Sequence, residues 1–187
     1  AGRAAEKVGT ADVGMFRTEY LFLTDPGVPN EEEQYKYDRQ IMEDSPNKTV
    51  TIRTRDLGGD KTVPYLGRRS EANPFMGWRS IRLSFEHPRL FERQIRAILR
   101  AGRHGKVFML FPMITTLEEL RHDNRLVDDS RLKLRREVVP SGEDVKTGVL
   151  HGFHTAPICI VAHILVTALD LNVTHGRDQY LVSVYRA

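Results

Sequence analysis

Short apolar or β-branched runs alternate along this chain with longer segments of helical periodicity, and this alternation most constrains its fold. The β-branched and aromatic content predicts strands at residues 12–16, 48–54, 106–111, 145–151 and 171–175. Apolar spacing predicts helices at residues 31–44, 87–102, 115–138 and 156–169. Strands joined by crossover helices form parallel sheets, so the pattern predicts an α/β fold. It does not distinguish a doubly wound sheet from a barrel, and residues 177–186 fit either a helix or a strand.

Two of these helices carry signals at their amino-terminal ends. The three glutamates at residues 31–33 are expected at the start of a helix, where the helix dipole favours negative charge, rather than in a metal site. Thr115, with Glu118 three residues later, predicts a capping box at the start of the helix at 115–138.

Composition narrows the class of protein. The 187 residues are 40% hydrophobic and carry a net charge of +3, which fits one globular core. Basic residues are interleaved with acidic ones, so no nucleic-acid partner is expected. No apolar run reaches the roughly 20 residues of a membrane helix. Cys159 is the sole cysteine, which excludes an internal disulfide and fits a reducing compartment, so a soluble, cytoplasmic chain without membrane contact is expected.

Charge is concentrated where two predicted strands end. The polar residues at these ends are Arg17, Thr18, Glu19, Arg53, Thr54, Arg55 and Asp56. Ligands of parallel α/β folds bind beyond the carboxyl ends of the strands. Arginines on two different strands, facing one cavity, would bind a phosphate or carboxylate through their forked donors, with Gly58, Gly59 and Lys61 adding backbone amides and charge. The alternative is that each arginine is an exposed strand-end residue paired with a nearby acid.

Other candidate residues have simpler structural readings. Trp78 and Arg79 fit a core tryptophan beside a solvated arginine, and Met109 and Met113 fit the core. His151 and His154 are three residues apart and lack a third ligand for a metal.

Several motifs resemble consecutive blocks of one known family. They are "VGMFRTEYLF", "PNEEEQY", "VTIRTRDLGGDKTVPY", "EANPFMGWRSIRL", "RQIRAILRAGRHGK" and "MLFPMITTLEELR", in order from Asp12 to Arg121. The family is Enzyme I of the sugar phosphotransferase system, the phosphoenolpyruvate-protein phosphotransferase. Pyruvate phosphate dikinase and phosphoenolpyruvate synthase share its barrel, but the motifs resemble Enzyme I most.

The resemblance implies a fold, an activity and a binding site. The fold is a (β/α)8 barrel of the TIM type, of which residues 1–187 would form a truncated part, from about the second to the sixth strand. The activity is phosphoryl transfer from phosphoenolpyruvate to a protein histidine, with Mg²⁺ as cofactor and a phosphocarrier protein as partner. By resemblance, Arg17 and Arg53 bind the phosphoryl group, Arg79 lies near the same site, and Arg186 matches a further site arginine.

Residues 148–187 depart from the family pattern. Gly152 stands where the family has a magnesium-binding glutamate, and His175 and Gly176 replace an Asn-Asp pair that supplies the second metal ligand. No residue is matched to a metal ligand or to the family's general-acid cysteine, and the phosphohistidine domain is absent. The resemblance therefore leaves two readings open: the phosphoenolpyruvate-binding part of an active phosphotransferase, or a catalytically inactive truncated paralogue that acts as a binding module, including as a homodimer. A frameshift or true divergence would each produce the altered segment.

Overall fold

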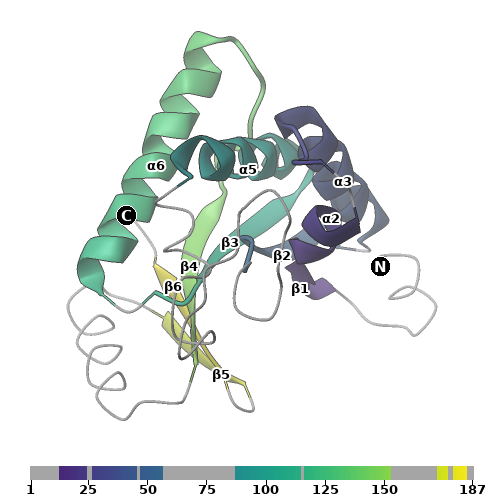
Figure 1. Cartoon of the computed structure of the whole chain (residues 1–187). Coiled ribbons are helices and arrows are strands. Elements are labelled where there is room, and N and C mark those ends of the chain that lie inside the picture. Colours follow the sequence, from purple (N-terminus) through teal and green to yellow (C-terminus); the bar gives the residue numbers. More distant parts are fainter. Residues whose placement is uncertain are drawn as a thin grey trace.

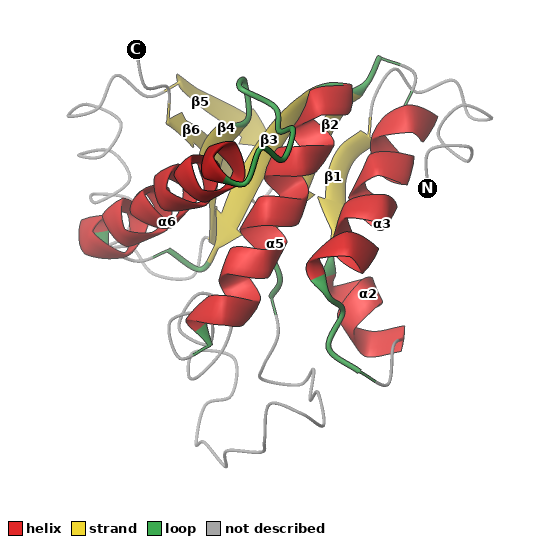
Figure 2. Ribbon diagram, turned by 90° about the horizontal axis from the view of Figure 1, so that it is seen from above, coloured by secondary structure: helices red, strands yellow, loops and turns green. Residues whose placement is uncertain are grey.

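A computed structural model describes residues 13–24, 27–45, 47–56, 87–114, 116–152, 172–176 and 179–184. Within these residues, the strands form one six-stranded sheet with the order β1-β2-β3-β4-β6-β5. Figure 1 shows the sheet crossing the molecule beneath the helices. Figure 2 shows the helices α3, α5 and α6 on one face of the sheet, and α5 packs between the other two.

The first four strands are parallel, as the sequence predicts. They are β1 (Val13–Arg17), β2 (Thr49–Arg53), β3 (Lys106–Pro112) and β4 (Lys146–Gly152). The helices between them are α2 (Glu19–Thr24), α3 (Glu31–Asp44), α5 (Pro88–Ala101) with the short 3-10 helix η2 (Gly102–His104), and α6 (Leu117–Arg136). The helix α2 has only six residues, too few to show helical periodicity in the sequence. The parallel sheet confirms the α/β class and is compatible with a phosphoenolpyruvate-binding barrel.

The last two strands correct the expectation of a wholly parallel sheet. β5 (Asn172–Gly176) and β6 (Gln179–Val184) pair antiparallel with each other, and β6 also pairs antiparallel with β4. A parallel connection needs a crossover of a dozen or more residues, whereas only two residues separate Gly176 from Gln179. The residues that fitted either a helix or a strand thus contain a strand, and the helix predicted at 156–169 lies outside the described residues.

Capping boxes begin two of the helices. Asn30 caps α3, with hydrogen bonds of 3.0 and 2.7 Å exchanged with Glu33, so the glutamates at 31–33 do form the first turn of a helix. Thr116, not Thr115, caps α6, and its partner is Glu119 at 3.2 and 3.0 Å. Both Thr-x-x-Glu spacings fit the capping pattern in the sequence, so the prediction was wrong by one residue.

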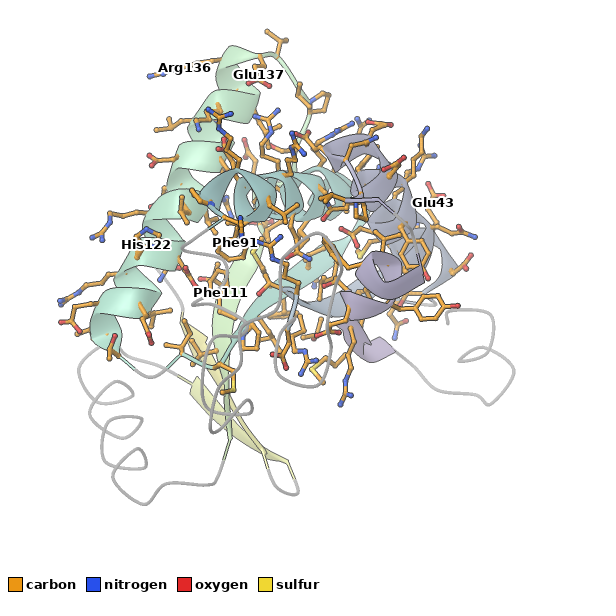
Figure 3. All side chains as sticks on the ribbon, in the orientation of Figure 1. Glu43, Phe91, Phe111, His122, Arg136 and Glu137 are labelled. Atoms are coloured by element: carbon orange, nitrogen blue, oxygen red, sulfur yellow. The ribbon has the colours of Figure 1, made fainter. Side chains whose placement is uncertain are left out.

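The core lies between this helical face and the sheet. Its buried residues include Val50, Ile52, Ile95, Ile98, Met109 and Phe111. Phe91 of α5 meets Phe111 of β3 edge to face, with ring centroids 6.3 Å apart. Figure 3 labels both side chains. Burying a large apolar side chain contributes about 1.5–3 kcal/mol. Met109 is a core residue, as expected, while Met113 is only half-buried.

Candidate anion-binding site

Arg17 and Arg53 end two neighbouring strands. They are register partners, directly after the partners Phe16 and Ile52. Phe16 and Ile52 are buried in the core, and the Phe16 ring lies 5.7 Å from Tyr37 of α3. Side chains alternate along a strand, so the two arginines point to the face opposite the helices. The structure thus brings Arg17 and Arg53 together at the carboxyl ends of β1 and β2.

The remaining predicted site residues are not placed. Arg79 and Arg186 lie outside the described residues, as do Gly58, Gly59 and Lys61.

Arg53 is held by two acids. Its side chain is buried, and Nη2 lies 2.5 Å from Glu19 Oε1 while Nη1 lies 3.6 Å from Asp56 Oδ2. Glu19 Oε1 also accepts a hydrogen bond of 3.0 Å from the backbone N–H of Asp56. A buried ion pair offsets its desolvation only when further hydrogen bonds satisfy its atoms, and on the Glu19 side the Asp56 N–H provides one. Arg53 is therefore paired with acids but buried, whereas Arg17 is exposed.

One donor of Arg53 has no partner among the described residues. Its Nε–H is buried and meets no hydrogen-bond acceptor there. Leaving a buried donor unsatisfied costs about 1–3 kcal/mol, and more for a charged group. An oxygen of a bound anion would satisfy this donor.

Arg55 has a different environment from Arg53. Its side chain is fully buried, and its guanidinium carbon lies 5.9 Å from the ring centroids of both Phe22 and Phe91. Both distances fall within the range of cation–π attraction. Arg55 therefore packs with the aromatic core, while Arg17 and Arg53 carry the charge at the strand ends.

A buried glutamine links the two strand ends, and the sequence analysis did not identify it. Gln94 of α5 donates from Nε2 to Thr18 Oγ1 at 2.9 Å and accepts the Arg55 backbone N–H at 3.0 Å. Thr18 Oγ1 in turn donates to the carbonyl oxygen of Arg53 at 3.0 Å. The available signal was a polar residue within the apolar stripe of α5, three residues after Phe91 and next to Ile95.

The strand ends also hold an unusual backbone conformation. Met113, directly after β3, has φ of 63°, a value that non-glycine residues adopt infrequently. Such residues gather at functional sites more often than elsewhere.

Among the described residues, the acids beside Arg53 do not fit a magnesium site. Within the part of the chain that the structure describes, no group of three or more His, Cys, Asp or Glu side chains could hold a metal ion. Glu19 and Asp56, the acids nearest the arginines, are engaged by Arg53. Gly152 and Gly176 both pair with Gln179 in one row of the sheet, and a glycine supplies no carboxylate oxygen.

A groove of about 670 Å³ lies elsewhere. It runs along α6 and residues 143–147, which lead into the start of β4. It therefore does not coincide with the carboxyl ends of β1 and β2.

Comparison with known proteins identifies the family. Residues 1–171 match the family model described as PEP-utilising enzyme, PEP-binding domain. The chain belongs to this family. It is 38% identical over 185 residues to the phosphoenolpyruvate-protein phosphotransferase of Buchnera aphidicola subsp. Schizaphis graminum, a match that covers 98% of this chain and 32% of that protein.

Two further relatives carry the same name. The phosphoenolpyruvate-protein phosphotransferase of Haemophilus influenzae is 35% identical over 97% of this chain and 32% of its own length. The one from Staphylococcus carnosus is 39% identical over 76% of this chain and 25% of its own length. The chain thus spans about a third or less of these relatives. The matches confirm the resemblance to Enzyme I and give no support to an inactive binding module.

Within the described helices, none combines the length and apolar character needed to cross a membrane.

Proposed function

We propose that this chain is the phosphoenolpyruvate-binding part of a phosphoenolpyruvate-protein phosphotransferase, and that Arg17 and Arg53 bind the phosphoryl group. The observation that carries the proposal is the pairing of these two arginines in register at the carboxyl ends of β1 and β2, in a chain of the PEP-binding family. Arg79 and Arg186 complete the substrate-binding set by resemblance alone.

The geometry suits a phosphoryl group. Phosphoryl transfer spreads negative charge over the equatorial oxygens, so an enzyme contributes mainly positioned positive charge. Exposed Arg17 presents a forked donor to solvent, and Arg53 offers a buried Nε–H that needs an acceptor. Glu19 holds the far side of the Arg53 guanidinium, so its orientation is set before the ligand arrives.

The proposal extends to the whole protein. The four parallel strands would belong to a (β/α)8 barrel of the TIM type, to which residues 1–187 contribute about the second to the sixth strand. The phosphoryl group would pass to a protein histidine and from there to a phosphocarrier protein in the cytoplasm. Mg²⁺ would supply charge neutralisation in the full enzyme, but the residues described here do not fit it.

Thermal melting with and without phosphoenolpyruvate tests the proposal. A ligand that binds only the folded state raises its stability by about 2.7 kcal/mol at a hundred times its Kd. Arg17→Gln should abolish this shift, because Arg17 is exposed and its replacement leaves no buried acid without a partner. Arg93 of α5 is also exposed, so Arg93→Gln is the control and should keep the shift. A cooperative melt that phosphoenolpyruvate does not move would overturn the proposal.

A further inference from the structure

Gln94 of α5 makes hydrogen bonds to the ends of β1 and β2, and the donor and acceptor of each bond are fixed. The backbone N–H of Arg55 can only donate, so the Gln94 carbonyl oxygen must face it and the amide nitrogen must face Thr18. Thr18 Oγ1 therefore accepts from Gln94, and its single proton is directed to the carbonyl oxygen of Arg53. Each group has one possible role, so the chain of hydrogen bonds has one arrangement.

We propose that Gln94 and Thr18 are positioning residues that hold Arg53 in place to receive the phosphoryl oxygens of phosphoenolpyruvate. This inference rests on the proposed function, because it assigns Arg53 to the substrate.

The segment from Arg53 to Asp56 is held by groups from four elements. Thr18, at the end of β1, donates to the Arg53 carbonyl, and Gln94 of α5 accepts the Arg55 N–H. The Thr54 N–H donates to the carbonyl of Leu110 in β3 at 2.8 Å. Glu19, the first residue of α2, holds both the Asp56 N–H and the Arg53 side chain. The guanidinium is thus held at its tip by Glu19, and the backbone that carries it is held by the Gln94–Thr18 pair.

Gln94 and Thr18 are buried, so their polar groups need the hydrogen bonds that they make. Gln94 and Thr18 are 1% and 4% exposed, and α5 is apolar on either side of Gln94, at Phe91 and Ile98. A buried amide costs free energy unless it is hydrogen-bonded. For packing of the helix alone, an apolar residue at position 94 would do as well. Both hydrogen bonds of Gln94 are instead directed at the strand-end segment. Displacements of about 1 Å in a supporting residue reduce activity about a hundredfold in known enzymes.

The test compares Thr18→Val, Thr18→Ser and Gln94→Met, with Ile98→Val as the control on the same helix. Isothermal titration measures the Kd for phosphoenolpyruvate, and NMR follows amide exchange at Arg55 and the Nε–H signal of Arg53. Thr18→Val and Gln94→Met should weaken binding by about tenfold or more, as expected when a binding group is displaced. Thr18→Ser keeps the hydroxyl and should bind as the wild type does. Ile98→Val should leave both binding and the Arg53 signal unchanged.

The outcomes separate this inference from the proposed function. If the wild type binds phosphoenolpyruvate and Thr18→Val binds it equally well, the positioning role is overturned while the substrate assignment stands. If the wild type does not bind, the proposed function fails, and the Arg53 Nε–H signal decides the positioning role. That signal should broaden in Thr18→Val and recover in Thr18→Ser, and an unchanged signal in Thr18→Val overturns the inference. If Gln94→Met does not fold, the Thr18 pair still decides it, because both variants keep Gln94.

Discussion

Arginine–glutamate pairs at the strand ends and on the helical face share the same short distances but differ in burial. Arg53 Nη2 and Glu19 Oε1 are 2.5 Å apart, with side chains 8% and 4% exposed. Arg96 of α5 lies equally close to Glu31 of α3, but their side chains are 12% and 22% exposed. Removing a charge from water is costly, so a buried ion pair contributes little net stability. Removing one of its partners is nevertheless strongly destabilising, because the other charge stays buried and unpaired. Pairs nearer solvent tolerate such loss.

The helical face forms a wider network than the strand ends. Arg96 also binds Glu137 at the end of α6, and Arg100 binds Glu31 and Glu32 at the start of α3. Figure 3 shows Glu137 at the end of α6. This network joins α5 to the start of α3 and the end of α6, whereas the strand-end pair holds one arginine. The same pair of residue types therefore joins helices in one region and, under the proposed function, orients a substrate-binding arginine in the other.

The largest expected effect comes from breaking the buried pair. Arg53→Met should destabilise the chain by about 3–5 kcal/mol, because the Glu19 carboxylate stays buried without its arginine. Glu19→Gln should cost less, because Arg53 keeps Asp56 at 3.6 Å. The double variant should be destabilised by much less than the sum of the two. Urea unfolding at neutral pH measures all three. Additive losses would show that the two residues do not act as a pair.

Two buried carboxyls inside the helices contrast with Glu19, which is paired with Arg53. Asp123 of α6 is fully buried, and neither oxygen has a hydrogen-bond partner among the described residues. Its nearest ionisable neighbour, His122 Nδ1, is 3.7 Å away, and burial lowers the pKa of His122. Burial, with a smaller contribution from Glu119, raises the pKa of Asp123 from 3.8 to about 8. Burial likewise raises the pKa of Asp38 in α3 to about 8.

A pKa raised on folding makes stability fall as pH rises. The folded chain keeps the proton of Asp123 between about pH 4 and pH 8, while the unfolded chain releases it, so its contribution weakens by up to about 1.4 kcal/mol per pH unit in that window. Asp123→Asn should remove the share of this dependence that Asp123 contributes, while that of Asp38 remains, and should be more stable than the wild type by up to about 4 kcal/mol at pH 7. Unfolding curves from pH 4 to 8 measure the difference. A gap between the two proteins that stays constant with pH would contradict the assignment.

Removing a charge from the helical network should have a smaller effect. Glu31→Gln should cost about 0.5–1 kcal/mol, since Arg96 and Arg100 keep other acids and partial contact with water. High salt should reduce this loss, because the network lies near solvent. Melting curves at low and high ionic strength measure it. A loss as large as that of Glu19→Gln would remove the distinction between the two regions.

The smallest expected effect concerns backbone strain outside the site. Val138, after the end of α6, is 86% exposed and has φ of 58°. A left-handed conformation costs a β-branched residue about 1–2 kcal/mol, and glycine relieves part of this. Val138→Gly should therefore stabilise the chain by about 0.5 kcal/mol and leave phosphoenolpyruvate binding unchanged. A change in phosphoenolpyruvate binding would show that the end of α6 is coupled to the carboxyl ends of β1 and β2, which contradicts this prediction.

Much of the fold was accessible from the sequence because local signals agreed with it. The helix predicted at residues 31–44 has these bounds in the structure, since Asn30 and the following glutamates mark its start. The four parallel strands followed from β-branched runs separated by helical segments. The sequence did not predict which threonine caps α6, because Thr115 and Thr116 both precede a glutamate at the right spacing. It also did not predict the direction of β6, which depends on the strands that β6 pairs with.

The sequence by itself determined the α/β class, the family and the presence of charge after β1 and β2. These depend on the order of residue types along the chain, which local periodicity and motifs record. The tertiary structure was needed to show that Arg53 is buried against Glu19, that the Arg55 guanidinium lies 5.9 Å from the rings of Phe22 and Phe91, and that Gln94 of a separate helix reaches both strand ends. Burial and hydrogen-bond partners arise between residues far apart in the chain, so spacing alone does not contain them.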